Sequence, residues 1–287
     1  MLSPAYSKKL TLFTVKNSQV EQKWGIYMDK PTRIYQCEDT AEGILSAVYD
    51  AGLSGYGHKY IKIQPQIENQ MENFELFAEY VPVVTEEEKV LRVIHSVRDK
   101  ISRQAHFYMM SAVASCYPDR GDAIYQFVTY GFTMGAKVCD ALQIPCVKRI
   151  FEIKRAVHNE AHFMKEFLRF QEVQREPALL LAVIEPKNRV IPFITEHFAD
   201  RFPEEWFIIY DKTHREASFH YKEGNWELHI LTEEEAEKLE ELSEQQEDYV
   251  DLWKAFFNSI AIEERKNEKL QRNMFALHYR KHATEFL

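Results

Sequence analysis

Residues 155–170 read RAVHNEAHFMKEFLRF, and they place a carboxylate where a helix should be apolar. At 3.6 residues per turn, one face of a helix over 151–173 carries Ile153, Val157, Glu160, Met164 and Phe167. Four of these five side chains are apolar, so the face is expected to be buried, and Glu160 with it. A buried carboxylate is costly unless it is paired, hydrogen-bonded or protonated. Glu160 is therefore the first candidate for a functional residue.

A second row of polar residues lies on the neighbouring face of this helix: Arg155, His158, His162 and Arg169. Arg155 is five residues from Glu160, a poor spacing for a pair on one helix. The partner is therefore expected from a distant segment, for example Arg201 or Arg215. Two interpretations stay open. Glu160 forms a structural ion pair that docks the helix, or it lies in a polar pocket whose arginines bind an anionic ligand such as phosphate.

His158 and His162 are four residues apart, the spacing of two metal ligands on one helix. The zinc-protease helix reads H-E-x-x-H, whereas this segment reads H-N-E-A-H and puts its glutamate in a different place. Nothing in the sequence selects a third ligand among the possible ones: Glu185, His197 and Asp211. We therefore predict no metal and no cofactor, and keep the pair His158 and His162 as the alternative metal site.

The composition indicates a globular protein of one large or two modest domains, with 287 residues, 45% hydrophobic and 28% charged. No apolar run approaches the roughly 20 residues that cross a bilayer. Residues 1–18 lack the apolar core of a signal peptide. The four cysteines have no C-x-x-C spacing, which predicts free thiols in a reducing compartment: Cys37, Cys116, Cys139 and Cys146. We therefore expect a cytoplasmic protein.

The net charge of −9 is concentrated in one segment. Residues 232–251 hold ten acidic residues and one lysine, so the rest of the chain sums to zero. Residues 141–175 and 262–287 each carry more Lys and Arg than Asp and Glu. Because phosphate binding depends on local basic surface, the acidic total does not exclude a nucleic-acid ligand.

The pattern of elements predicts an α+β fold, with a helical N-terminal and middle region and a small antiparallel sheet covered by helices in the C-terminal half. We expect a leader over 1–28, a mainly helical region over 29–145 and an α+β domain over 146–287. Gly131 and Gly135 predict either close helix packing or a turn. The expected strands cover 33–37, 59–65, 178–186 and 206–211, with a hairpin over 217–231. The expected helices cover 38–53, 85–101, 105–117, 119–137, 147–173, 190–202 and 250–260.

Three runs of sequence resemble a bacterial family of unknown function that is associated with DNA repair or DNA metabolism. They are VHNEAHFMKEFLRFQEV (157–173), LLLAVIEPKNRVIPFITEHFADRFPEEWFIIYD (179–211) and LWKAFFNSIAIEERKNEKLQRNMFALHYRKHATEF (252–286). The opening IYQCEDTAEGILSAVYDAG (34–52) resembles the family's N-terminal segment. The chain departs from the family at Met274-Phe275, where a Met-Pro pair is usual.

The resemblance implies a radical SAM protein as a partner, because members are typically encoded beside one. The same C-terminal domain is also found fused to uracil-DNA-glycosylase-like modules. The resemblance supplies no catalytic residue. The polar residues that match its signature stay open as site candidates: Arg155, Glu160, His162, Arg169, Glu185, Arg201 and Arg272.

Three functions follow as hypotheses. The first is a nucleic-acid-binding accessory partner of a radical SAM enzyme, which would bind phosphates through Arg155, Arg169, Arg201 and Arg272 and stack bases on Tyr279 or Trp226. The second is a hydrolase or nuclease acting on a nucleotide or DNA, with Glu160 as its acid or base and His162 or His158 as a second proton carrier or metal ligand. The sequence holds no P-loop, dinucleotide fingerprint or nucleophile elbow. No motif therefore decides whether the protein is an enzyme. The third is a protein–protein scaffold that docks through residues 232–251.

Overall fold

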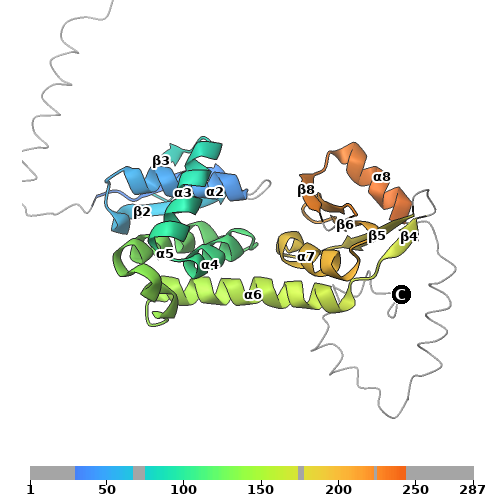
Figure 1. The fold of residues 1–287 in the computed structure, drawn as a ribbon. Coiled ribbons are helices and arrows are strands. Elements are labelled where there is room, and N and C mark those ends of the chain that lie inside the picture. The colour runs from blue at the N-terminus through green and yellow to red at the C-terminus, as the bar shows by residue number, and fades with distance from the viewer. Residues whose placement is uncertain (1–29, 67–74, 174–177, 223–224, 244–287) are drawn as a thin grey trace, which may run out of the picture.

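The computed structural model describes residues 30–66, 75–173, 178–222 and 225–243. The α+β class is confirmed: two units of helices and strands lie along one long helix, α6 (Pro145–Phe167) (Figure 1). The predicted leader over 1–28, the helix within 250–260, Arg272 and Tyr279 lie outside the described residues.

The N-terminal unit contains a three-stranded parallel sheet, of which we predicted the strands over 33–37 and 59–65 but neither the third strand nor the parallel pairing. The central strand β1 (Arg33–Glu38) pairs with β2 (Ile61–Gln66) and with β3 (Glu79–Pro82). Helix α2 (Ala41–Leu53) connects β1 to β2 and begins after Thr40, whose side chain accepts a hydrogen bond from Gly43 N–H at 3.0 Å. Parallel pairing joins segments far apart in sequence, so no local turn signal announces it.

Three further helices complete this unit: α3 (Glu87–Lys100), α4 (Arg103–Val113) and α5 (Arg120–Met134), followed by a 3-10 segment, Gly135–Asp140. The two glycines have different functions. A Cβ at Gly131 would lie 2.6 Å from the Ile101 side chain, so this glycine permits close packing. Gly135 has a φ of 61° and ends α5.

The C-terminal unit is a five-stranded sheet of order β4-β5-β6-β7-β8. Its strands are β4 (Gln171–Val173), β5 (Leu179–Ile184), β6 (Trp206–Asp211), β7 (Glu216–His220) and β8 (Trp226–Ile230). Strands β5 and β6 are parallel, joined by α7 (Ile191–Arg201), so the sheet is mixed rather than antiparallel. Helices α7 and α8 (Glu233–Ser243) pack against different hydrophobic clusters of this sheet.

The expected helix over 147–173 ends earlier than predicted. Leu168 has an extended conformation (φ −62°, ψ 134°), and the chain then enters β4. Residues 171–173 pair with β5 in an antiparallel register, which outweighs their helical sequence pattern.

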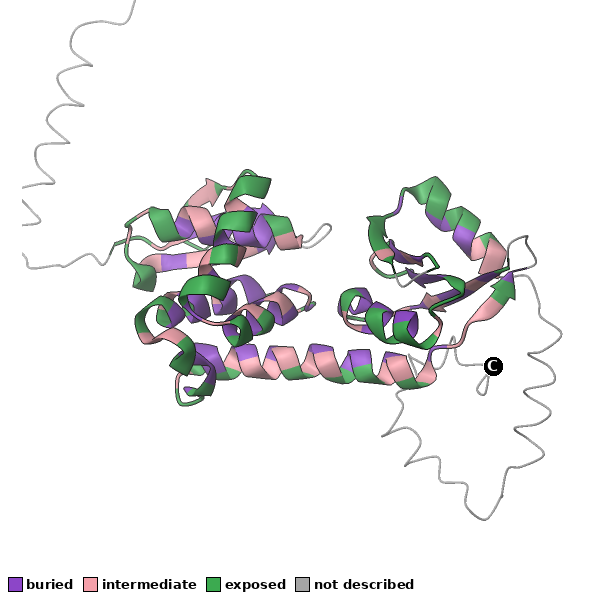
Figure 2. Cartoon of the chain, viewed as in Figure 1, coloured by how far each residue is buried: buried purple, intermediate pink, exposed green. Residues whose placement is uncertain are grey.

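Helix α6 contributes to both hydrophobic cores. Val147, Ile150 and Ile153 pack in the core of the N-terminal unit, and Ala161 and Met164 pack in the C-terminal one. Buried residues occupy the side of α6 that faces the two units (Figure 2). The domain boundary at residue 145 stays a prediction, since one helix serves both cores. None of the helices within the described ranges is long and apolar enough to span a membrane.

Candidate functional site

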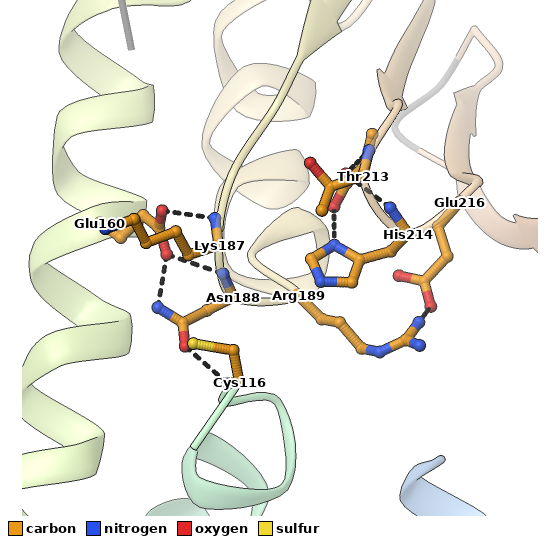
Figure 3. Close-up of polar contacts among 9 residues, drawn as sticks. Cys116, Glu160, Lys187, Asn188, Arg189, Thr213, His214 and Glu216 are labelled. Atoms are coloured by element: carbon orange, nitrogen blue, oxygen red, sulfur yellow. Dashed lines mark hydrogen bonds and ion pairs between the residues drawn. The ribbon is translucent and has the colours of Figure 1, made fainter. Parts of the chain in front are cut away.

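The carboxylate of Glu160 is buried, with 3% of the residue exposed, as its position on the apolar face predicted. Oε1 accepts a hydrogen bond from the backbone N–H of Lys187 at 2.8 Å. Oε2 accepts two more, from the backbone N–H of Asn188 at 2.9 Å and from its side-chain amide at 2.5 Å (Figure 3). These donors belong to the loop between β5 and α7. Amide groups, which carry no net charge, thus hydrogen-bond a carboxylate for which we expected a guanidinium.

The hydrogen-bond chain continues from Asn188 into the N-terminal unit. Its Oδ1 accepts a hydrogen bond from the backbone N–H of Cys116 at 2.9 Å, in the loop between α4 and α5. The N–H of Arg189 donates to the carbonyl of Ala114 at 2.9 Å. We call Glu160, Asn188 and Cys116 the hinge bracket, because they connect α6, the β5–α7 loop and the α4–α5 loop. This geometry fits the structural interpretation of Glu160.

Cys116 of the hinge bracket is an exposed free thiol. Partial burial of the sulfur, followed by the negative charge of Glu160, raises its pKa above the ordinary value. A thiol with a raised pKa carries little thiolate at neutral pH and is a poor nucleophile.

The arginines that we expected beside Glu160 form other contacts. The guanidinium of Arg215 lies 3.7 Å from the carboxylate of Glu233, and both side chains are largely exposed. Arg201, at the end of α7, is exposed and lies 5.8 Å from the centre of the Phe202 ring. Arg169 donates hydrogen bonds to two backbone carbonyls at the end of α6, each at 3.2 Å.

The two histidines of α6 lie in different surroundings. His162 is exposed, and its Nε2 lies 3.1 Å from the Glu166 carboxylate. His158 is half-buried and its Nε2 lies 3.0 Å from Ser111 Oγ. Burial, followed by the charges of Lys154 and Lys165, lowers the pKa of His158, which favours the neutral ring at physiological pH.

No group of three His, Cys, Asp or Glu side chains arranged to hold a metal ion is found among the described residues. Of the three possible further ligands, Glu185 is half-buried at the end of β5 and His197 is exposed on α7. Asp211 is fully buried and bonded to His214. The structure therefore gives the histidine pair of α6 no third protein ligand within the described ranges.

Helix α6 carries three cations that form no ion pair with any described residue: Arg155 is exposed, and Lys154 and Lys165 are half-buried. We call Lys154, Arg155 and Lys165 the basic stripe. The Lys154 ammonium lies 5.3 to 5.9 Å from the ring centres of Phe107, Tyr108 and Phe151. Cations that are not neutralised by neighbouring carboxylates are available to an anionic ligand.

Aromatic rings lie directly beside the basic stripe. Phe107 of α4 is 43% exposed. The ring of His158 lies between Phe107 and Phe193 of α7, with ring-centre distances of 4.9 and 5.0 Å. The row of polar residues along α6 was evident from the helical period, whereas Phe107 comes from another helix and could not be assigned to it from sequence alone.

A carboxylate–imidazole pair in the turn after β6 was not recognised from the sequence. Asp211 Oδ1 accepts hydrogen bonds from the backbone N–H groups of Thr213 and His214, at 2.9 and 3.1 Å. Asp211 Oδ2 lies 2.6 Å from His214 Nδ1, which fixes the orientation of the ring. The spacing D-x-x-H at the end of a buried strand is the sequence pattern that could have identified this pair.

An ion pair lies next to this histidine (Figure 3). Glu216 pairs with Arg189, and burial raises the pKa of Glu216 while the charges of Arg189 and His214 oppose the rise. An oriented imidazole can act as an acid or a base. Among the described residues, however, the hydrogen bonds of His214 go to Asp211, and no hydroxyl or thiol is bonded to it as a nucleophile.

The chain was compared with protein families and with curated proteins. Residues 118–285 match the family described as "Domain of unknown function (DUF4130)". No curated protein matches the chain significantly. The matched segment includes α5, all of α6 and the C-terminal unit, and it covers more than half of the 287 residues. The chain therefore belongs to the DUF4130 family, a family whose domain has no known function.

Proposed function

We propose that the protein binds nucleic acid through the basic stripe and acts as an accessory partner of a radical SAM enzyme in DNA repair or DNA metabolism. The observation that supports the proposal most is the set of three cations on α6 that pair with no carboxylate among the described residues, with the exposed ring of Phe107 beside them. Single-stranded nucleic acids are bound by this combination, since cations attract the backbone and rings stack on bases. The radical SAM partner rests on the family resemblance alone.

The surroundings of Glu160 favour a binding protein over a hydrolase that uses this residue. A general acid or base must reach the proton that it transfers, either directly or through one water molecule. The Glu160 carboxylate is instead buried and accepts three N–H hydrogen bonds within the hinge bracket. His162, its proposed helper, is an exposed neighbour of Glu166.

The binding proposal predicts salt-sensitive affinity that depends on the basic stripe. We expect the purified chain to bind a fluorescently labelled 20-nucleotide DNA strand in anisotropy titrations at low salt. The triple variant Lys154→Glu, Arg155→Glu, Lys165→Glu should lose at least about tenfold in affinity. Its slope of log K against log salt should be smaller by roughly two, the value for three lost phosphate contacts on a single strand.

A matched control variant distinguishes the effect of the basic stripe from the effect of a change in net charge. Lys59→Glu, Lys100→Glu, Lys137→Glu makes the same change in net charge at exposed sites outside α6. This control should keep most of the wild-type affinity. Equal losses in both variants would show only a general charge effect and would contradict the assignment to α6. Absence of DNA binding at low salt, both alone and with the radical SAM protein, would contradict the proposal as a whole.

A further inference from the structure

A pocket of about 400 Å³ lies in the N-terminal unit between α2, α3 and α5. Its size falls within the range of about 300–1,000 Å³ that is usual for small-molecule sites. Most of its wall is apolar, formed by side chains such as Val48, Val93, Val128 and Phe132. The described lining residues include none from α6, so the pocket is separate from the basic stripe.

One residue with a permanent charge is among the described lining residues, Arg92. Its Nη1 donates to the hydroxyl of Tyr49 at 3.0 Å, and its Nη2 donates to the carboxylate of Glu88 at 2.5 Å. The Arg92–Glu88 pair is exposed, with side-chain exposures of 58% and 73%. An exposed pair of this kind contributes little stability, so a ligand carboxylate can replace Glu88 at small cost.

A second polar group lies on the pocket wall. His58 Nδ1 and the hydroxyl of Tyr125 are 2.7 Å apart, and both residues line the pocket. Gly55 and Gly57, with φ values of 60° and 108°, allow the tight loop that precedes His58. No aspartate or glutamate is among the described lining residues. The pocket thus combines apolar walls with positive or neutral polar groups.

We propose that this pocket binds a small organic carboxylate with an apolar body of about one ring, and that Arg92 binds its carboxylate. The apolar walls favour the body of such a ligand, and a guanidinium matches the planar carboxylate in geometry. A phosphate ligand fits less well. Phosphate sites gather several donors or a helix N-terminus, whereas one guanidinium is the single fixed cation of the described lining. The site is independent of nucleic-acid binding.

Phenylacetate and its neutral amide, phenylacetamide, test the proposal by isothermal titration calorimetry on the full chain. Phenylacetate should bind saturably and about tenfold more tightly than the amide, since a guanidinium forms two parallel hydrogen bonds and an ion pair with a carboxylate but a single hydrogen bond with an amide carbonyl. Arg92→Met should reduce the affinity for phenylacetate to that for the amide. Glu88→Gln should increase it, because it removes the carboxylate that competes for Arg92. Arg92→Met should weaken binding of the amide less than that of phenylacetate, because the amide loses one hydrogen bond and no ion pair, and Glu88→Gln should change the affinity for the amide less than that for phenylacetate.

A pocket-filling variant locates the binding site. A Cβ at Gly52 would meet no atom within 4 Å, so Gly52→Phe can add a ring beside the pocket without a backbone clash. It should abolish binding of both compounds, whereas Ala136→Phe, at an exposed position outside the pocket, should not. Circular dichroism confirms that both variants fold. Phenylacetate binding that survives Gly52→Phe, no saturable binding at all, or tighter binding of a deoxynucleoside monophosphate would overturn the proposal.

Discussion

The carboxylate of Glu160 accepts hydrogen bonds on both of its oxygens, and a neutral amide can accept on only one. In Glu160→Gln, whichever way the amide turns, its NH₂ group opposes an N–H of Lys187 or of Asn188. We expect a loss of about 2–3 kcal/mol in the free energy of unfolding, because a buried donor is left without an acceptor. Urea unfolding followed by circular dichroism measures this loss.

His162→Gln is the matched control, two residues further along the same helix at an exposed position. It should change the free energy of unfolding by no more than about 0.5 kcal/mol. If Glu160→Gln were equally neutral, the hinge bracket would not depend on the carboxylate, and an acid–base function for Glu160 would regain support.

At the scale of residues, periodicity predicted where Glu160 points but not what binds it. Its inward direction follows from the helical repeat of its neighbours. Among its partners are backbone N–H groups and an asparagine 28 residues away. Every residue except proline has a backbone N–H, so the sequence marks none of them as a partner. We expected an arginine as the partner because Glu160 carries a negative charge. In the structure, Arg215 lies beside Glu233 and Arg201 beside Phe202.

At the scale of elements, the start of α5 lies unusually close to β2. A Cβ at Gly121 would lie 2.8 Å from both the carbonyl oxygen and the Cγ2 of Ile63. The next residue, Asp122, accepts a hydrogen bond from Ile63 N–H at 2.6 Å, so α5 cannot move away without losing it. We expect Gly121→Ala to destabilise the protein by about 1–3 kcal/mol, the usual cost of overpacking.

Gly52→Ala is the contrasting substitution, because Gly52 is helical and its Cβ would meet no atom within 4 Å. It should stabilise the protein by about 0.5–1 kcal/mol, since alanine favours helix over glycine. Thermal unfolding of both variants gives the comparison. Similar shifts of Tm for the two would contradict the close packing of α5 on β2.

Elements with strong local signals were predicted well, and short strands were not. The strand over 206–211 has the predicted bounds, and α7 begins and ends within one residue of its prediction. β3 and β4 are only four and three residues long. Strands of this length depend on partners from other parts of the chain, so their own residues carry little pattern. In the N-terminal unit, the strands over 33–37 and 59–65 were predicted close to their observed bounds, whereas β3 and the parallel pairing were not, because pairing depends on contacts between distant parts of the chain.

At the scale of the whole molecule, one helix and one loop connect the two units within the part of the chain that the structure describes. Helix α6, with 23 residues, enters both hydrophobic cores, and Val157 in its middle is fully buried. Beside it, His158 packs between a ring of α4 and a ring of α7. The sequence predicted α6 as one of the longest helices but could not show that it belongs to two cores, because core membership depends on tertiary contacts.

The hinge bracket should therefore control whether the two units unfold together. Asn188→Ala removes the acceptor of Cys116 N–H and one of the donors to Glu160. In differential scanning calorimetry, we expect the wild type to unfold in one transition whose calorimetric and van't Hoff enthalpies agree. In the variant, the van't Hoff enthalpy should fall below the calorimetric one as the units separate. Asn159→Ala, at an exposed position of α6, should keep the single transition. A single, merely shifted transition in Asn188→Ala would mean that α6 alone couples the units, since the loop contact would then add stability without transmitting unfolding from one core to the other.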